Sequence, residues 1–343
     1  MRRRTLLVGL AATAGIGASA ACSPPSRPVT VTVTATGGAA SPSAVASTPA
    51  PASSVPILGS TAASSLAPRE MTAPYTPVPG AAPGAYAVGR QVLRFRRGDR
   101  ALPTTVWYPA KGAVPGTPDP VDDAPPAAGR FPLVLFSHGL TAQPDDYADM
   151  LTRWVRAGFV VAGPTYPRTS YGVADFDPLD IVNQPADASW VLDSLLAPAG
   201  PFGAMIDPDR LAAAGHSAGG ITTVGLFSAY RDERLKAGVV LNGTDFQGAP
   251  FTGPPAALLF VHGRRDNTVT YRAGRAVYAA VPWSRAMLSI TDGGHVTEAP
   301  DFEATVGTST EFLRWALYGD AAARARLPRA AAAGDAGTLQ ERL

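Results

Sequence analysis

Residues 209–230 read DRLAAAGHSAGGITTVGLFSAY, and this stretch decides the fold. Its first half predicts a buried strand, and the residues after Ser217 predict a helix. Gly215 and Gly219 flank the serine in the pattern Gly-x-Ser-x-Gly, where the strand must turn sharply into the helix. Such a turn holds the serine in a strained backbone conformation and needs small neighbours, because the chain approaches itself closely. The stretch therefore predicts a strand–helix unit that presents a serine at the N-terminus of the helix, where amide groups favour an anion.

The rest of the chain alternates strands and helices around this unit. The apolar run at residues 131–139 predicts a strand buried on both faces, and further strands are predicted at 159–166, 236–243, 256–263 and 285–294. Helical patterns lie between or after them at 145–159, 180–197, 271–281 and 311–319. Two runs at 86–97 and 102–110 predict an antiparallel hairpin before the first of these. This order predicts an α/β fold with a doubly wound, mostly parallel sheet flanked by helices.

The two ends of the chain differ from this pattern. Residues 1–22 combine three arginines with a short apolar stretch and small residues before Cys22, which predicts an export signal with a lipobox-like cleavage site. Residues 23–84 are rich in Ser, Pro and Ala, and we expect a disordered tether there. We expect the folded domain to span 85–320, and an Ala/Arg-rich tail with a loosely held helix to span 321–343.

Cys22 is the only cysteine in the chain, so a disulfide within the chain is impossible. A lipidated Cys22 would anchor the protein to the extracytoplasmic face of a membrane without a spanning segment, whereas an ordinary signal peptide would leave it secreted. The net charge of +2 offers no case for nucleic-acid binding, and we expect a monomer.

A serine hydroxyl needs a base, most often histidine, and the chain has four. His216 adjoins Ser217, but neighbours on a tight turn point apart, so we interpret it as a wall residue. His138 and His262 end strands and are interpreted as structural. His295 follows the last strand on a glycine-rich loop, and the chain order nucleophile, acid, base requires a late histidine. His295 is therefore the predicted base.

The acid that orients this histidine should lie between it and the serine. Asp266 follows a buried strand by one tight turn, and Asp245 follows the preceding strand as its rival. Asp292 is too close to His295 and is expected to shape the loop. We favour Asp266.

Two backbone amides should stabilise an oxyanion. One is the amide of Ala218, directly after the serine. The other is expected from Leu140, in the loop after FPLVLFSHG, where Gly139 allows the turn.

Five segments, FPLVLFSHGLTA, AGFVVAGPTYP, IDPDRLAAAGHSAGG, FVHGRRDNTV and DGGHV, occur in this order and resemble the α/β-hydrolase superfamily. The chain is similar to its branch of platelet-activating-factor acetylhydrolases, chlorophyllases, dienelactone-hydrolase-like proteins and bacterial cutinases. The resemblance covers residues from about 86 to 320. It implies a serine esterase with Ser217 as nucleophile, Asp266 as acid, His295 as base, and the amides of Leu140 and Ala218 in the oxyanion hole.

Two positions distinguish this chain from particular members of that branch. Asn242 stands where acetylhydrolase-type members carry their acid, which supports Asp266. Leu140 stands where bacterial polyester-degrading cutinases usually carry an aromatic residue, and their C-terminal disulfide is impossible here.

The resulting hypothesis is an exported serine hydrolase that cleaves carboxylic esters of small molecules, lipids or polyesters. Acyl transfer to an alcohol by the same triad is an alternative, and a non-catalytic cell-surface binding homologue is another. No metal or organic cofactor is expected, because no His/Cys/acidic cluster has ligand spacing.

Overall fold

The computed structural model describes residues 70–343 apart from 118, 199 and 297–300. Within these residues, ten strands form one sheet in the order β10-β9-β8-β7-β6-β4-β5-β2-β1-β3. β4, β5, β6, β7, β8 and β9 run parallel to one another. β2 pairs antiparallel with β5, β10 pairs antiparallel with β9, and β1 forms a hairpin with β2. The strands are β1 (Ala87–Arg97), β2 (Arg100–Ala110), β3 (Val121–Asp122), β4 (Phe131–Ser137), β5 (Val160–Pro164), β6 (Ile206–His216), β7 (Leu235–Leu241), β8 (Ala257–Gly263), β9 (Ser284–Ile290) and β10 (Gly337–Arg342).

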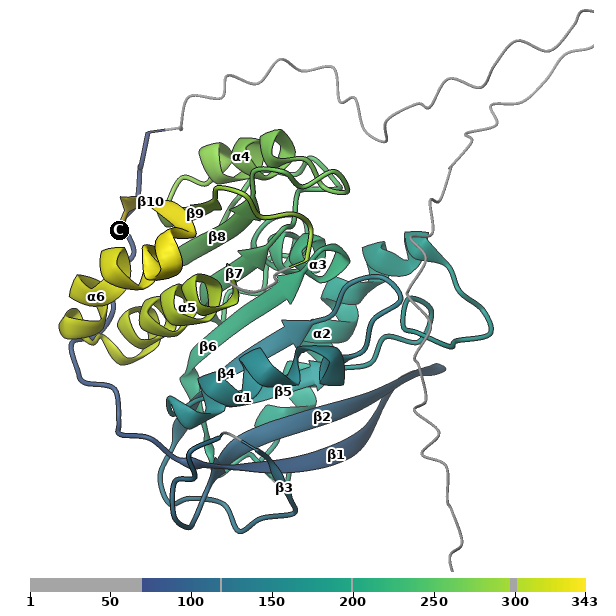
Figure 1. Cartoon of the computed structure of the whole chain (residues 1–343). Helices are drawn as coiled ribbons and strands as arrows, with labels where there is room; N and C mark the ends of the chain where they lie inside the picture. Colours follow the sequence, from purple (N-terminus) through teal and green to yellow (C-terminus); the bar gives the residue numbers. More distant parts are fainter. Residues whose placement is uncertain (1–69, 118, 199, 297–300) are drawn as a thin grey trace, which may run out of the picture. The chain divides into compact units, whose positions relative to one another are not determined.

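Helices cover both faces of this sheet (Figure 1). They are α1 (Ala148–Arg156), α2 (Gln184–Leu196), α3 (Ala218–Phe227), α4 (Tyr271–Ala280), α5 (Asp301–Tyr318) and α6 (Ala321–Ala331), with short 3-10 helices η1 (Pro144–Tyr147), η2 (Pro178–Asn183) and η3 (Ala333–Asp335). One apolar cluster packs α1, α5 and α6 against the sheet, and a second packs α2, α3 and α4 against the other face. The predicted doubly wound, mostly parallel α/β fold is confirmed.

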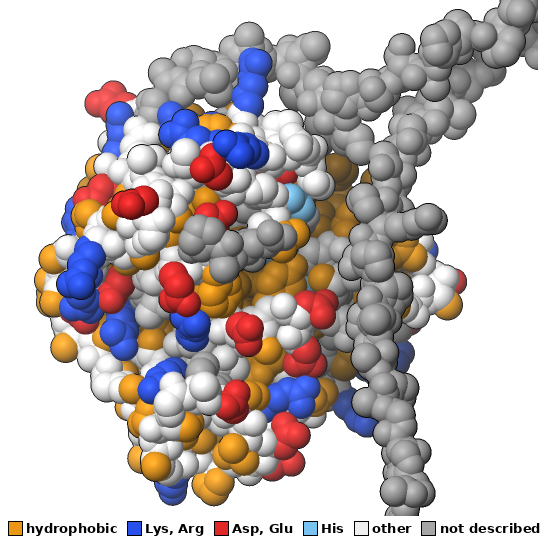
Figure 2. All heavy atoms as spheres, viewed as in Figure 1, with side chains coloured by type: hydrophobic (Ala, Val, Ile, Leu, Met, Phe, Trp, Pro, Cys, Tyr) orange, Lys and Arg blue, Asp and Glu red, His pale blue; other side chains and the backbone are white. Residues whose placement is uncertain are grey.

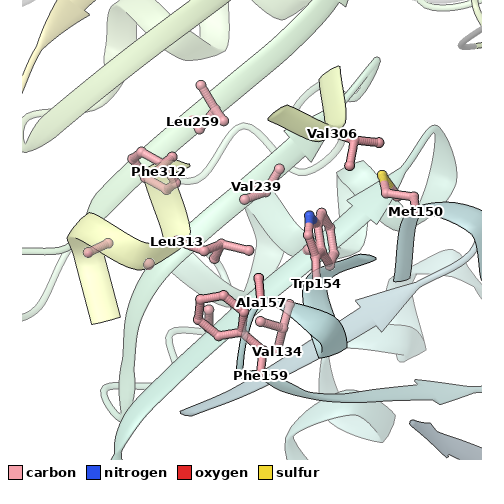
Figure 3. Close-up of a cluster of buried hydrophobic side chains, with 14 of the residues drawn as sticks. Val134, Met150, Trp154, Ala157, Phe159, Val239, Leu259, Val306, Phe312 and Leu313 are labelled. Carbon is pink, nitrogen blue, oxygen red and sulfur yellow. The ribbon is translucent and has the colours of Figure 1, made fainter. Parts of the chain in front are cut away.

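The central strands are buried on both faces, which explains their continuous apolar sequences. Every residue of β4, β8 and β9 is buried. Figure 3 shows the cluster beneath α1 and α5, where Trp154 lies among side chains of both helices and of the sheet. The Trp154 Nε1–H donates to Ser309 Oγ at 3.1 Å, so its one polar atom is satisfied inside the core.

Residues 70–84, which we expected to belong to the tether, lie against the folded unit instead. The Tyr75 amide donates to Ser284 Oγ at 3.0 Å, and its hydroxyl donates to the Ala316 carbonyl at 2.8 Å. The ring also packs edge-on against Trp315, with the two ring centroids 6.2 Å apart. The backbone amide, hydroxyl and ring of Tyr75 thus hold this segment on the folded unit, together with backbone hydrogen bonds from Thr72 to the Pro282 carbonyl and from Gly80 to the Gly319 carbonyl. The remainder of the expected tether, the signal segment and Cys22 lie outside the described residues.

The C-terminal tail also belongs to the fold. Ala323, Leu327 and Ala331 are buried at four-residue spacing along α6, which packs on α5. β10 then pairs antiparallel with β9 and places Leu339 opposite Leu288. The tail beyond residue 320 is therefore an ordered helix and edge strand rather than the loosely held helix that we expected, because small residues on one face allow close helix packing.

A buried ion cluster fixes the segment between β5 and α2 to the hairpin. Arg100 Nη2 lies 2.6 Å from a carboxylate oxygen of both Asp180 and Asp187, and these two carboxylates are almost completely buried. Arg97 Nε donates to Asp187 at 2.7 Å. The cluster holds residues 171–184 in place beside the carboxyl ends of the strands.

The face in Figure 2 carries acidic and basic side chains that intermingle, without an extended area of either sign. In the described part of the chain, no helix has both the length and the apolar character to cross a bilayer.

Candidate active site

Ser217 occupies the sharp turn between β6 and α3. Its backbone has φ 56° and ψ −118°, in the left-handed half of the Ramachandran map where a non-glycine residue is strained. The Ser217 amide donates to the Leu241 carbonyl of the neighbouring strand at 2.9 Å, which supports this conformation. The turn is the nucleophile elbow that the Gly-x-Ser-x-Gly pattern predicts.

The flanking glycines are required by close backbone approaches. A Cβ on Gly219 would lie 1.8 Å from the Ser137 carbonyl oxygen, and a Cβ on Gly215 would lie 2.2 Å from the Gly219 carbonyl oxygen. Neither space can hold a methyl group. The pattern therefore reflects the packing of the turn against β4.

His295 reaches the serine from the loop after β9. Its Nε2 lies 2.8 Å from Ser217 Oγ, and its Nδ1 lies 2.8 Å from Asp266 Oδ2. The ionised carboxylate can only accept, so Nδ1 carries the proton and Nε2 is left to accept from the serine hydroxyl. The three predicted residues form one hydrogen-bonded series, although 78 positions separate the serine from the histidine.

Asp266 is held as an anion after β8. Its Oδ1 accepts from the amides of Thr268 and Val269 at 2.8 and 2.9 Å, and Asn242 Nδ2 donates to Oδ2 at 2.8 Å. Burial opposes ionisation, but hydrogen bonds from His262, His295 and Asn242 outweigh it and hold the pKa of Asp266 well below its usual range.

The rival acids lie elsewhere. Asp245 accepts from the amide of Gln247 at 3.0 Å in a local turn. Asp292 pairs with Arg265 at 2.5 Å, and both side chains are about 70% exposed. Neither carboxylate contacts the His295 ring among the described residues.

The strand-end histidines have structural contacts. His138 Nε2 accepts from the Tyr166 amide and lies 2.9 Å from Ser170 Oγ, and burial lowers the pKa of His138 to about 4. His262 Nε2 donates to the Val269 carbonyl at 2.8 Å and lies 3.4 Å from Asp266 Oδ2. His262 thus supports the loop that carries the acid.

Of the two amides expected to stabilise an oxyanion, that of Ala218 directly follows the serine, and that of Leu140 lies one residue beyond Gly139. Ala218 is the first residue of α3, and Leu140 follows Gly139, whose added Cβ would lie 3.4 Å from Ser217 Cβ. Within the described part of the chain, neither the Leu140 amide nor the Ala218 amide donates to another protein group. Thr141 next to them has φ 58°, and its amide donates to the Thr169 carbonyl at 2.7 Å, which fixes the loop.

A pocket of about 360 Å³ adjoins this loop. Its lining is polar and consists of Thr141, Gln143, Asp146 and Tyr171. The Tyr171 amide donates to the Ala142 carbonyl at 3.4 Å, so the pocket lies where the loop after β4 meets the segment after β5.

Sequence reasoning missed two side chains that hold the loop after β9, which carries His295. Asn242 Nδ2 donates to the Gly294 carbonyl at 2.8 Å, and His216 Nε2 donates to the His295 carbonyl at 2.7 Å. We used Asn242 only to choose between acids and interpreted His216 as a wall residue. The signal for both was their place directly at the carboxyl ends of adjacent parallel strands.

Among the residues that the structure describes, no group of three His, Cys, Asp or Glu side chains could hold a metal ion.

A mostly parallel sheet with helices on both faces and a strained serine directly after β6 are the features of the α/β-hydrolase fold. The family model described as Chlorophyllase matches residues 95–246, a span that includes Leu140 and Ser217. The resemblance to the chlorophyllase-like branch is therefore confirmed, and the match supports carboxylic ester hydrolysis as the general activity. No curated protein matches the chain.

Proposed function

We propose that the chain is an exported serine hydrolase that cleaves carboxylic esters through an acyl-enzyme on Ser217. The single observation that carries the proposal is the hydrogen-bonded series from Ser217 Oγ through His295 to Asp266, with distances of 2.8 Å at both steps. The amides of Leu140 and Ala218, which donate to no other group in the described part of the chain, would supply the remaining element of acyl transfer.

In the first half of the reaction, Ser217 Oγ attacks the ester carbonyl carbon while its proton passes to His295 Nε2. The negative charge on the carbonyl oxygen is stabilised by the amides of Leu140 and Ala218. The imidazolium is stabilised by Asp266, and it returns the proton to the leaving alcohol as the C–O bond breaks. In the second half, His295 takes a proton from water, the hydroxide attacks the acyl carbon, and the serine recovers its proton as the acid leaves.

A fluorophosphonate probe tests the chemical class directly. We expect the purified protein to be labelled and Ser217→Ala to be unlabelled with the same melting temperature. Absence of label on folded wild-type protein would favour the non-catalytic binding homologue. If the label is present, adding a competing alcohol during ester turnover separates hydrolysis from acyl transfer by the ratio of acid to new ester formed.

His295→Ala tests the assignment of the base. We expect kcat to fall by at least about 10³-fold without loss of the fold, because the serine would lack a proton acceptor. Activity near that of the wild type would show that another base is used.

The proposed substrate class rests on the surroundings of the oxyanion loop. The pocket beside this loop is polar, and Tyr171, the first residue of the segment 171–184 that contains η2, lines it. These features support acetylhydrolase-, lipase- or cutinase-like cleavage of small or extended accessible esters. A series of nitrophenyl esters graded by acyl length would measure this preference, and a maximum at long acyl chains would contradict it.

We also propose that lipidated Cys22 anchors the protein to the extracytoplasmic face of a membrane. Cys22→Ser should move the protein from the membrane fraction to the soluble fraction. Unchanged fractionation would leave an ordinary signal peptide as the explanation of the N-terminal sequence.

A further inference from the structure

A chain of hydrogen bonds connects the loop of the oxyanion hole to the loop of the base. The Gly139 amide lies 3.1 Å from Tyr147 Oη, Tyr147 Oη lies 2.9 Å from His216 Nδ1, and His216 Nε2 lies 2.7 Å from the His295 carbonyl oxygen. Tyr147 ends η1, and His216 is the last residue of β6, directly before Ser217. The connection therefore passes through the elbow itself.

The direction of each bond is forced by chemistry. The His295 carbonyl can only accept, so the proton of a neutral His216 ring is on Nε2. Nδ1 must then accept, and Tyr147 donates its hydroxyl proton to it. The Gly139 amide can only donate, so Tyr147 Oη accepts from it. Every group in the series is neutral and satisfied.

Burial keeps the series neutral. Burial and, to a smaller extent, the neighbouring His295 ring lower the pKa of His216 to about 4. Burial likewise raises the pKa of Tyr147 to about 12. Ring packing adds to the hydrogen bonds, because the ring centroids of His216 and His295 lie 4.9 Å apart and those of Tyr147 and Phe136 lie 4.7 Å apart.

We infer that Tyr147 and His216 are positioning residues that hold the oxyanion loop and the base loop in register around Ser217. By accepting a hydrogen bond from the Gly139 amide, Tyr147 fixes the loop that carries the next amide, that of Leu140, which we assign to the oxyanion hole. By donating to the His295 carbonyl, His216 fixes the main chain from which the imidazole reaches Ser217 Oγ. This inference rests on the proposed function of the triad.

Two substitutions of His216 separate this role from simple packing. The amide nitrogen of glutamine reaches roughly the place of Nε2, whereas asparagine ends near the place of Nδ1. We expect His216→Asn to lower kcat by about 10- to 100-fold with little change in KM, because a small displacement of the base affects the chemical step more than substrate binding. His216→Gln should restore most of that loss.

Tyr147→Phe keeps the ring and removes the hydroxyl, and we expect it to lower kcat about tenfold. Tyr318→Phe is its matched control, because the Tyr318 hydroxyl is also buried and donates to the Gly158 carbonyl far from the site. The control should lower the melting temperature without changing kcat. A double variant of Tyr147→Phe and His216→Asn should lose less activity than the product of the two single losses, because the bond between Tyr147 and His216 is broken in both single variants.

The inference is overturned if His216→Asn keeps wild-type kcat, if Gln and Asn are equally damaging, or if the two losses multiply in the double variant. Should His216→Asn fail to fold, Tyr147→Phe decides the question against Tyr318→Phe. Failure of the proposed function is distinguishable, since the wild-type protein would then neither react with the fluorophosphonate nor hydrolyse esters.

Discussion

Replacing Asp266 by asparagine should reverse the tautomer of the His295 imidazole, the proposed base. Oδ1 accepts from the amides of Thr268 and Val269, so the oxygen of the new side chain must face those two donors. Its NH₂ group must then face His295 Nδ1 and the Asn242 NH₂ group, both of which lie 2.8 Å from the native Oδ2. His295 can accept this donor only by moving its proton from Nδ1 to Nε2.

A proton on Nε2 prevents the imidazole from accepting the proton of Ser217. We therefore expect kcat to fall by about 10³- to 10⁴-fold, the range associated with the wrong tautomer in a Ser-His-Asp site. The opposed NH₂ groups of residues 242 and 266 should also cost about 1–3 kcal/mol of folding stability, because one buried donor lacks an acceptor.

Steady-state hydrolysis of a nitrophenyl ester and thermal unfolding would measure the two effects. Asp245→Asn is the matched control, because its carboxylate bonds only to a local amide, and we expect its kcat to stay within about threefold of the wild type. A kcat for Asp266→Asn above about a tenth of the wild-type value, or an equal loss in Asp245→Asn, would refute the tautomer argument.

Three further predictions concern packing, charge and pH. Gly219→Ala should abolish most activity or destabilise the fold, because the new Cβ would lie 1.8 Å from a backbone oxygen. At Gly307 the nearest atom to an added Cβ is 3.5 Å away, so Gly307→Ala should leave the melting temperature nearly unchanged. Arg100→Met should lower the free energy of unfolding by about 3 kcal/mol in denaturant titrations, because it leaves two buried aspartates without one of their cationic partners. The ion pairs of Arg90 are exposed, so Arg90→Met should lower the free energy of unfolding by less than about 1 kcal/mol. Because the folded-state pKa of Asp266 is depressed, its ionised form contributes stability that is present above the unfolded-state value of about 4 and is lost as pH falls through the lower folded-state value. The difference in melting temperature between the wild type and Asp266→Asn should therefore shrink between about pH 5 and pH 2, and a constant difference would contradict this.

The sequence predicted the strand–helix alternation because the central strands are buried on both faces and carry unbroken apolar runs. It also predicted which side chains meet at the site, since chain order and strand ends restrict the choice to Ser217, Asp266 and His295. The ends of the domain were harder to predict. The segment around Tyr75 is attached through that residue's two hydrogen bonds and ring contact and through backbone hydrogen bonds of Thr72 and Gly80, and such contacts leave no periodic pattern in the sequence. The tail did carry a pattern, Ala323, Leu327 and Ala331 at four-residue spacing, but alanine is a weak indicator of burial.

The contact between Tyr147 and His216 could not be predicted from the sequence. The two residues are 69 positions apart, and the hydroxyl–imidazole bond depends on how η1 turns back over the end of β6. Neither a tyrosine at position 147 nor a histidine at position 216 indicates that the two side chains form a hydrogen bond with each other. Such contacts follow from loop geometry, which apolar periodicity does not encode.

Backbone strain is concentrated where the site forms. Five non-glycine residues with positive φ occur in the part of the chain that is described, and Thr141, Ser217 and Asn242 are three of them. These three follow β4, β6 and β7, which are neighbours in the sheet. Each of their amides donates to a backbone carbonyl of a neighbouring segment at 2.7 to 2.9 Å, so the assembled sheet offsets strain of about 1–3 kcal/mol per residue. The reactive geometry of Ser217 is therefore a property of three strands packed in register, and the Gly-x-Ser-x-Gly pattern only permits it.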